Sequence, residues 1–213
     1  MKEDNTYRIN MVENHIRTLN VIDDNVLNTL KTVPRKLFVP KTYESFAHVD
    51  IRIPIGFNQH MLLPSVEAKI LQAINIRNDE DVLVVGSGSG YLSTCISMFA
   101  RKVHSIDIIE NFIEKSKKIA DKITNKNMVF ENQNILDNLD LIKNHKVIIF
   151  TMALNDMDII LSNMNKNARC FVLHSDLNQP VQTGVIIHKT AKSSFMREYI
   201  LETNVESIIT EKI

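Results

Sequence analysis

The chain has 213 residues, a length that suits one large domain or one domain with an N-terminal extension. Its 25 lysines and arginines balance its 25 aspartates and glutamates, which excludes the strongly basic surface that nucleic acids and anionic membranes attract. No apolar run is long enough to span a bilayer, and the charged N-terminus predicts no signal peptide. Cys95 and Cys170 are expected to be buried thiols of a cytoplasmic protein, and the histidine spacing predicts no metal site.

The N-terminal third predicts helices separated by short irregular segments. Apolar residues recur at helical spacing over 7–19, where they form the stripe Ile9, Met11, Val12, Ile16 and Leu19. Asp23 or Asp24 is the candidate cap of a second helix, which ends before Pro34. The other predicted segments are an extended stretch over 35–40, a loop over 51–56 and a helix from Pro64 to about Ile74.

From residue 81 onward, apolar strands and amphipathic helices alternate. The expected strands are 81–85, 102–106, 128–131, 146–151 and 169–173. The expected helices are 91–100, 110–123 and about 157–164, with a polar loop after the third strand. Two last strands, 184–189 and 196–203, are expected to form a hairpin with a long turn. The alternation predicts an α/β fold with a mainly parallel twisted sheet, helices on both faces and a C-terminal antiparallel hairpin.

The predicted organisation has two parts that make one structural unit. Residues 1–75 are expected to form a helical and loop-rich cap over the carboxyl ends of the strands, and residues 76–213 to form the sheet domain. The cap is placed there because open α/β sheets bind their ligands at the carboxyl edge.

Three of the five glycines fall within five positions, at Gly86, Gly88 and Gly90. Glycine is kept where a chain turns tightly or lets a ligand approach closely. The cluster follows a predicted strand and precedes a predicted helix, which is the local structure of a nucleotide-binding crevice. A dinucleotide fingerprint would need its third glycine or an alanine at Tyr91. The observed G-x-G-x-G spacing instead resembles motif I of class I S-adenosylmethionine-dependent methyltransferases, and this resemblance implies their Rossmann-like fold and cofactor.

Asp107 ends the next predicted strand, about 20 residues after the first glycine. A carboxylate at this position can accept hydrogen bonds from both ribose hydroxyls of a nucleoside, although it can also cap the following helix. The resemblance implies that the cofactor contacts Gly86, Ser87, Gly88, Gly90, Asp107, Ile108, Asn134 and Ile135. Two acids that are usual in such sites are replaced here by Val84 and Asn134.

The N-terminal third carries a more specific resemblance. The segments are VPRKLFVP at 33–40, AHVD at 47–50, IPIG at 53–56 and GSGSGYL at 86–92. Together they resemble the protein-L-isoaspartate O-methyltransferases, and the similarity runs from about residue 10 to residue 175. The resemblance implies methylation of a protein or peptide carboxylate in the repair of damaged proteins. It implies no nucleic-acid or membrane partner, and a monomer or a small homo-oligomer is expected.

The substrate loop departs from this family. The family follows its P-I-G with G-Q-T-I-S-Q-P, whereas residues 58–64 of this chain read N-Q-H-M-L-L-P. Gln59 matches the family, the threonine is replaced by His60, and the serine, which is the usual active-site residue, is replaced by Leu62. The predicted substrate loop therefore comprises Gly56, Gln59, His60 and Leu62, with Leu62 facing the substrate carboxylate.

The catalytic residue stays open at this point. A carboxylate is already ionised near neutral pH, so the reaction needs orientation of the acceptor rather than a strong base. Leu62 donates no hydrogen bond, which predicts low native activity and a gain of about tenfold or more in Leu62→Ser. His60 and Ser65 are the candidate donors, but they also fit an ordinary loop histidine and a helix-start residue.

Two classes of function fit these residues. The first is a methyltransferase of the isoaspartyl type, which retention of the three glycines and Asp107 favours. The second is a divergent paralogue that binds the cofactor but has another substrate or a non-catalytic binding role, which loss of the serine favours. A methyltransferase that acts on a small molecule lies between the two.

Overall fold

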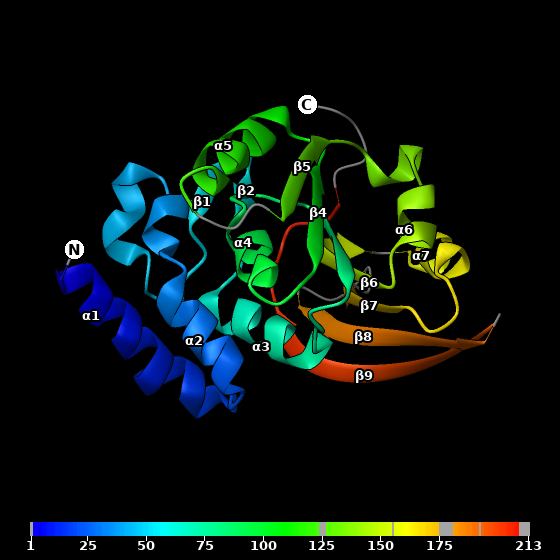
Figure 1. The fold of residues 1–213 in the computed structure, drawn as a ribbon, viewed down its shortest axis with the longest axis horizontal. Helices are drawn as coiled ribbons and strands as arrows, with labels where there is room; N and C mark the ends of the chain where they lie inside the picture. Colours follow the sequence, from blue (N-terminus) through cyan, green and yellow to red (C-terminus); the bar gives the residue numbers. More distant parts are fainter. Residues whose placement is uncertain (1, 124–126, 155, 175–180, 192, 209–213) are drawn as a thin grey trace.

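The computed structural model describes residues 2–123, 127–154, 156–174, 181–191 and 193–208 (Figure 1). Among these residues, seven strands form one sheet in the order β5-β4-β3-β6-β7-β8-β9. The strands are β3 (Asp81–Val85), β4 (Lys102–Asp107), β5 (Met128–Asn132), β6 (Val147–Leu154), β7 (Arg169–His174), β8 (Gln182–Ala191) and β9 (Ser194–Thr203). The strands from β5 to β7 are parallel, and β8 and β9 are antiparallel. The predicted α/β fold with antiparallel strands at one side is confirmed.

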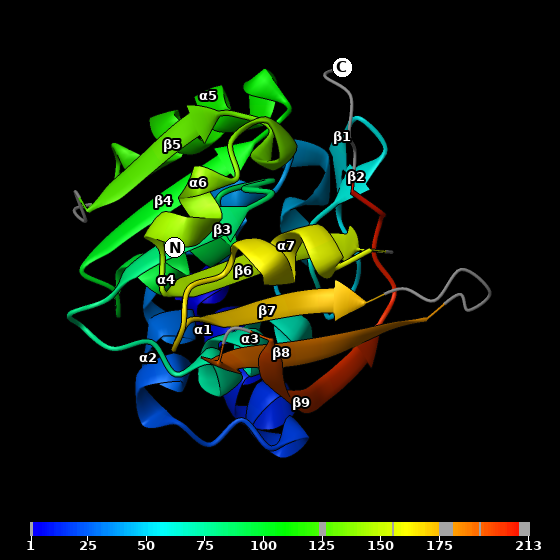
Figure 2. The ribbon, with the colours of Figure 1, turned by 90° about the vertical axis from the view of Figure 1, so that its right-hand side faces the viewer.

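Helices cover both faces of the sheet. They are α1 (Lys2–Met11), α2 (Asp24–Thr32), α3 (Pro64–Ile74), α4 (Tyr91–Ser97), α5 (Glu110–Ala120), α6 (Asp140–Asn144) and α7 (Asp158–Asn163). Figures 1 and 2 show α1, α2 and α3 on one side of the sheet and α6 and α7 on the other. Strand residues alternate between the two sides, so Val82 and Val84 join one apolar core while Leu83 and Val85 join the other.

Two helix starts follow from single residues, as the sequence predicts. The Asp23 carboxylate accepts hydrogen bonds from the backbone N–H groups of Asn25 and Val26, which caps α2. Pro64 occupies the first turn of α3, where its missing N–H costs no helical hydrogen bond. α3 then buries its apolar face against β7 and β9.

The N-terminal helix differs from the predicted stripe. It begins at Lys2, and it continues beyond α1 through a π-helical turn, Val12–Ile16, and a 3-10 turn, Arg17–Leu19. Val12 and Ile16 are fully buried, but Ile9 is exposed. The wider π-helical turn shifts the phase of the helix by part of a turn, so Ile9 no longer shares the buried face.

Other expected segments are wrong in detail. Residues 35–38 are not extended: they form a 3-10 turn, Arg35–Phe38. At its start, the Leu37 N–H donates a hydrogen bond to the Pro34 carbonyl at 3.0 Å. The expected loop over 51–56 contains the short strand β1 (Pro54–Gly56), which pairs with β2 (Gln59–His60). The expected polar loop after β5 contains α6, which buries Ile142.

The hairpin of β8 and β9 also has a shorter turn than predicted. The ladder extends until Ala191 pairs with Ser194, and residue 192 lies outside the described residues. Within the N-terminal part, α3 lies against the face of the sheet, and the residues that reach the pocket at the carboxyl edge are Glu67 and several of residues 52–63.

Candidate active site

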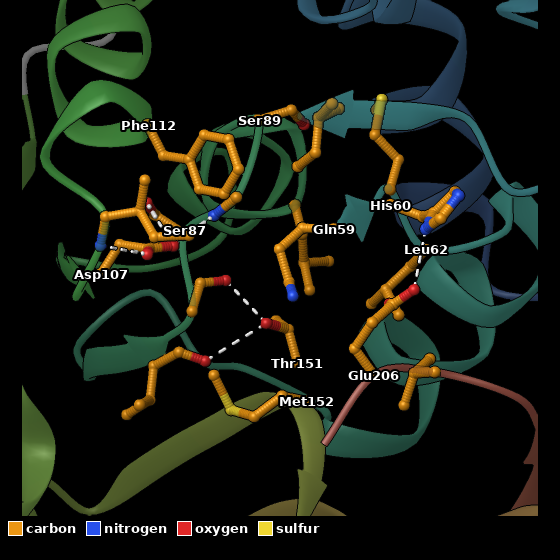
Figure 3. Close-up of a pocket in the computed structure, with 18 of the residues that line it drawn as sticks. Gln59, His60, Leu62, Ser87, Ser89, Asp107, Phe112, Thr151, Met152 and Glu206 are labelled. Atoms are coloured by element: carbon orange, nitrogen blue, oxygen red, sulfur yellow. Dashed lines mark hydrogen bonds and ion pairs between the residues drawn. The ribbon is translucent and has the colours of Figure 1, made fainter. Parts of the chain in front are cut away.

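A pocket lies at the carboxyl edge of the parallel strands. β4 and β5 lie on one side of β3 in the sheet, and β6 and β7 lie on the other. The strand order therefore reverses at β3, and the pocket lies at this topological switch point. Five segments supply most of its lining: 59–63, 85–89, 106–109, 133–135 and 203–208. Figure 3 shows Asp107 and Ser87 at one side, His60 and Glu206 at the other, and Gln59 and Thr151 between them.

The glycine loop is held against both neighbouring strands. The N–H groups of Gly86 and Ser87 both donate to the Ile106 carbonyl, at 2.9 and 3.0 Å. On the other side, a side chain on Gly86 would meet Thr151 Oγ1 at 2.5 Å and Met152 Cε at 2.3 Å. Because β6 approaches the loop so closely, the Thr151 hydroxyl donates a hydrogen bond to the Gly86 carbonyl at 2.6 Å. Gly86 is therefore required by the approach of β6 to the loop.

The other two glycines of the loop have different surroundings. Gly88 lines the pocket, and a side chain there would meet Ile55 at 3.4 Å. Gly90 does not line it, although the sequence places it among the cofactor-binding residues. A Cβ at Gly90 would lie 2.6 Å from Ser116 Oγ, so this glycine lets α4 pack against α5.

Asp107 is buried at the end of β4, and its carboxylate organises the loop. It accepts hydrogen bonds from the N–H groups of Gly88 and Ile109, both at 2.9 Å, and from the Ser87 hydroxyl at 3.4 Å. Burial raises the pKa of the Asp107 carboxyl, and the hydrogen bonds from Ile109 and Gly88 oppose that shift. Asp107 is not itself the N-cap residue of α5, which is Ile109, but its carboxylate accepts from the N–H of that residue and so also stabilises the start of the helix.

The residues after β4 and β5 form a mainly apolar wall beside Asp107. Ile108 and Ile135 line this wall together with Phe112 from the first turn of α5. Asn134 also lines the pocket, and its side-chain oxygen accepts from the Leu136 N–H at 3.0 Å. The structure thus brings seven of the eight predicted cofactor-binding residues into one pocket, and Gly90 is the exception.

The β1–β2 hairpin carries the substrate loop over the pocket. Its two turn residues, Phe57 and Asn58, have φ of 53° and 54°, which is typical of a tight two-residue hairpin. Phe57 packs edge-on against Phe112, with ring centroids 5.5 Å apart. This contact holds the hairpin against α5, while Gln59 and His60 line the pocket.

Two predicted residues of this region lie outside the pocket lining. Gly56 is the last residue of β1, next to the hairpin turn, and no heavy atom lies within 4 Å of a Cβ built on it. Ser65 is buried at the start of α3, where its hydroxyl donates to Asp50 Oδ2 at 2.8 Å and its N–H to Asp50 Oδ1 at 2.9 Å. Its surroundings match those of a helix-start residue, so we do not retain Ser65 as a catalytic candidate.

Leu62 lines the pocket, and its backbone is braced by a buried ion pair that the sequence does not indicate. The Leu62 carbonyl accepts from Arg35 Nη2 at 2.8 Å. Arg35 also pairs with Glu67, both side chains are buried, and the guanidinium lies 4.7 Å from the centre of the Tyr91 ring. Burial raises the pKa of Glu67 to about 7, against the opposing effect of Arg35.

A second group of charged residues at the pocket was also missed. Glu206 follows β9 and contacts His60 and Arg52, which precede α3 in the chain. The separations of 146 and 154 residues leave no local sequence signal for this group. Only the fold brings the C-terminal segment to the substrate loop.

The described part of the chain gives no sign of two other kinds of site. It contains no cluster of three or more histidine, cysteine, aspartate or glutamate side chains that could hold a metal ion. None of its helices has the length and apolar character needed to cross a membrane.

The sequence model of the protein-L-isoaspartate(D-aspartate) O-methyltransferase (PCMT) family matches residues 6–157, which is most of the chain. The chain belongs to this family. Among curated proteins, it is 34% identical over 121 residues to the protein-L-isoaspartate O-methyltransferase of Petrotoga mobilis, covering 57% of each chain. It is 38% identical over 103 residues to that of Bordetella petrii, covering 48% of this chain and 38% of the relative. The chain thus spans about half of the length of the curated family members it matches.

The fold of the family extends over nearly the whole chain. A Plasmodium falciparum protein described as a beta-aspartate methyltransferase (PCMT), crystallised with S-adenosyl-L-homocysteine, superposes with a TM-score of 0.80 at 17% identity. The match covers 96% of this chain and 99% of that protein. A second solved protein-L-isoaspartate O-methyltransferase matches with a TM-score of 0.77 at 18% identity, over 92% of this chain and 65% of that protein. At these identities the likeness establishes the fold, and with it the predicted Rossmann-like class.

Proposed function

We propose that this protein is an S-adenosylmethionine-dependent methyltransferase that methylates the free carboxylate of isoaspartyl residues in proteins or peptides, as a step of protein repair. The observation that carries the proposal is the pocket itself. In a chain of this family, one cavity joins the glycine loop and Asp107 to the substrate loop. Membership of the family and the bound S-adenosyl-L-homocysteine of the Plasmodium relative support the choice of cofactor.

The residues of the pocket fit S-adenosylmethionine. Among the contacts of the Asp107 carboxylate, the Ser87 hydroxyl is the most distant, at 3.4 Å against 2.9 Å for the N–H groups of Gly88 and Ile109, so a ribose hydroxyl can take its place. Gly88 opens the loop toward the pocket, where a Cβ would project against Ile55. Ile108, Ile135 and Phe112 offer apolar surface for an adenine ring.

When bound, S-adenosylmethionine supplies a methyl group on a positively charged sulfur. The protein must bring an acceptor carboxylate oxygen in line with that methyl carbon and keep water away, which is mainly an orientation effect. The new oxygen–carbon bond replaces the carbon–sulfur bond, so the products are a methyl ester and S-adenosylhomocysteine. No proton is transferred in this step. This chemistry therefore requires no general base in the pocket.

The non-catalytic alternative receives less support. It was motivated by Leu62, which offers no hydrogen bond to a substrate. The pocket nevertheless contains two side chains that can donate to a carboxylate, Arg52 and His60. We also propose a cytoplasmic location, which the two free, buried cysteines support, because unpaired thiols suit a reducing compartment.

The proposal is tested by mass spectrometry of a synthetic peptide with one isoaspartyl residue, incubated with the protein and S-adenosylmethionine. We expect a mass increase of one methyl group, which mild base removes because it is an ester. The same peptide with a carboxamide in place of the free carboxylate is the control. Methylation of both peptides, or of neither, contradicts the proposal.

A further inference from the structure

A carboxylate of the protein itself is held at the end of the pocket opposite Asp107 (Figure 3). Glu206 Oε1 lies 2.7 Å from His60 Nδ1, and Arg52 Nη2 contacts the same oxygen. An ionised carboxylate only accepts hydrogen bonds, so His60 Nδ1 is the donor in this pair. Arg52 Nη2 and His60 Nδ1 are 3.4 Å apart because both point at one oxygen.

This arrangement is a carboxylate-binding site by its chemistry. A guanidinium is always charged and presents its N–H groups in a planar fork, which suits a carboxylate. The second arm of the Arg52 fork, Nη1, donates to Asn204 Oδ1 at 3.1 Å. Arg52 and His60 lie on the same side of the pocket as Leu62, the position at which the family has a serine hydroxyl.

The bond to Glu206 is one that another carboxylate can replace. The side chains of Arg52, His60 and Glu206 are 31%, 33% and 24% exposed, respectively. Ion pairs this accessible to water contribute little to stability, because solvent screens them. Exchange of Glu206 for an incoming carboxylate is therefore a small perturbation of the fold.

The backbone of Glu206 is fixed independently of its side chain. The Glu206 carbonyl accepts from the Ala153 N–H, and the Ala153 carbonyl accepts from the Ile208 N–H, both at 2.9 Å. These bonds attach the segment after β9 to the end of β6. Only the side chain of Glu206 has to rotate to release Arg52 and His60.

We propose that Arg52 and His60 bind the carboxylate of the methyl acceptor, and that Glu206 occupies their donors until an acceptor arrives. The identity of the acceptor rests on the proposed function. In this arrangement Arg52 and His60 replace the donor that Leu62 does not provide. Glu206 then acts as a competitor, which sets the acceptor affinity and disfavours ligands without a negative charge.

Binding of an isoaspartyl peptide is measured by calorimetry on the full chain, saturated with S-adenosylhomocysteine, so that no methyl transfer is needed. We expect Glu206→Gln to bind the peptide about three- to tenfold more tightly, because the competing charge is gone. Arg52→Gln should bind about tenfold or more weakly, and Arg52→Lys should recover part of the loss. The peptide with a carboxamide in place of the carboxylate should bind all variants equally.

Arg101→Gln is the matched control. Arg101 forms a similar exposed pair with Asp81, at 2.7 and 2.9 Å, but at the start of β3, the opposite edge of the sheet. It should leave peptide binding unchanged, and circular dichroism checks that all variants fold. The inference is overturned if Arg52→Gln binds the peptide as tightly as the native protein, or if the native protein and Glu206→Gln both fail to bind it. If binding shifts as expected but no methyl is transferred in the separate assay, the carboxylate site stands and the proposed reaction falls.

Discussion

Asp107 illustrates how one residue serves the fold and a ligand together. Its two oxygens hold the glycine loop through Gly88 and the following turn through Ile109 before any ligand binds. This preorganisation lowers the cost of ligand binding, because the carboxylate need not be ordered first. A substitution of Asp107 is therefore expected to disturb the conformation of the glycine loop as well as the contact with the cofactor ribose.

The first residue-scale prediction concerns the cofactor. Asp107→Asn replaces a charged acceptor, so we expect S-adenosylhomocysteine to bind more weakly by about 1.5–3 kcal/mol. Calorimetry measures the difference. Asp121→Asn, which changes an exposed carboxylate at the end of α5 outside the pocket lining, should bind like the native protein. Equal affinity of Asp107→Asn and the native protein would remove Asp107 from the cofactor site.

The second residue-scale prediction concerns position 62, where the family has a serine and this chain has Leu62. The sequence alone predicts a gain of about tenfold from Leu62→Ser, because a hydroxyl returns to the pocket. If Arg52 and His60 already supply the donors, the methyl-transfer rate of Leu62→Ser should exceed that of Leu62→Ala by less than about threefold. Leu62→Ala is the reference because both variants lose the same buried apolar contact. An excess of tenfold would show that position 62 limits the reaction.

At the scale of the elements, the parallel strands were predictable because most of them, β3, β6 and β7 above all, are buried apolar runs. β3 and α3 agree with the predicted bounds, since an apolar run and Pro64 define them locally. The missed elements are short ones that tertiary contacts stabilise, such as α6 and the Arg35–Phe38 turn. The predicted residues at the strand ends line one pocket, whereas the sequence did not predict residues that reach the pocket from a distant segment, as Glu206 does.

The packing of α4 on α5 gives the element-scale prediction. Gly90→Ala places a Cβ 2.6 Å from Ser116 Oγ at a φ of +83°, whereas Gly56→Ala meets nothing within 4 Å at a φ of +102°. Both variants lose about 1 kcal/mol to backbone strain. The steric clash should make Gly90→Ala less stable than Gly56→Ala by about 2 kcal/mol or more in urea unfolding. Equal losses would mean that the helices separate at no cost.

At the scale of the whole molecule, the Arg35–Glu67 pair connects the N-terminal segments to the pocket. Arg35 follows α2 and pairs with Glu67 in α3, and the hydrogen bond that Arg35 donates to the Leu62 carbonyl fixes the substrate loop. The Arg35 guanidinium also lies 4.7 Å from the centre of the Tyr91 ring in α4, and this contact supports the proposal that residues 1–75 and 76–213 act as one structural unit. The segment after β9 reaches the same loop through Glu206, so segments from the first third of the sequence and from beyond β9 meet at the pocket.

The buried pair predicts a pH-dependent stability. The pKa of Glu67 rises from 4.5 to about 7, so between these values the native protein holds a proton that the unfolded chain has released. The contribution of Glu67 to stability therefore falls as the pH rises through this window. Relative to Glu67→Gln, the native protein should lose about 1–3 kcal/mol of unfolding free energy between about pH 5 and pH 7.5.

Urea unfolding at several pH values measures this difference. Glu44→Gln, which removes a partly exposed partner of Lys36, is the control. A difference between the native protein and Glu67→Gln that stays flat or grows with pH contradicts the raised pKa of Glu67.

The initial rate of transfer of a labelled methyl group, with an isoaspartyl peptide compared against its aspartyl isomer, tests the central claim most directly. The account predicts label on the isoaspartyl peptide, little on the aspartyl isomer, and a rate that falls in both Asp107→Asn and Arg52→Gln. Equal labelling of the two peptides, or no labelling of either at saturating S-adenosylmethionine, would contradict it.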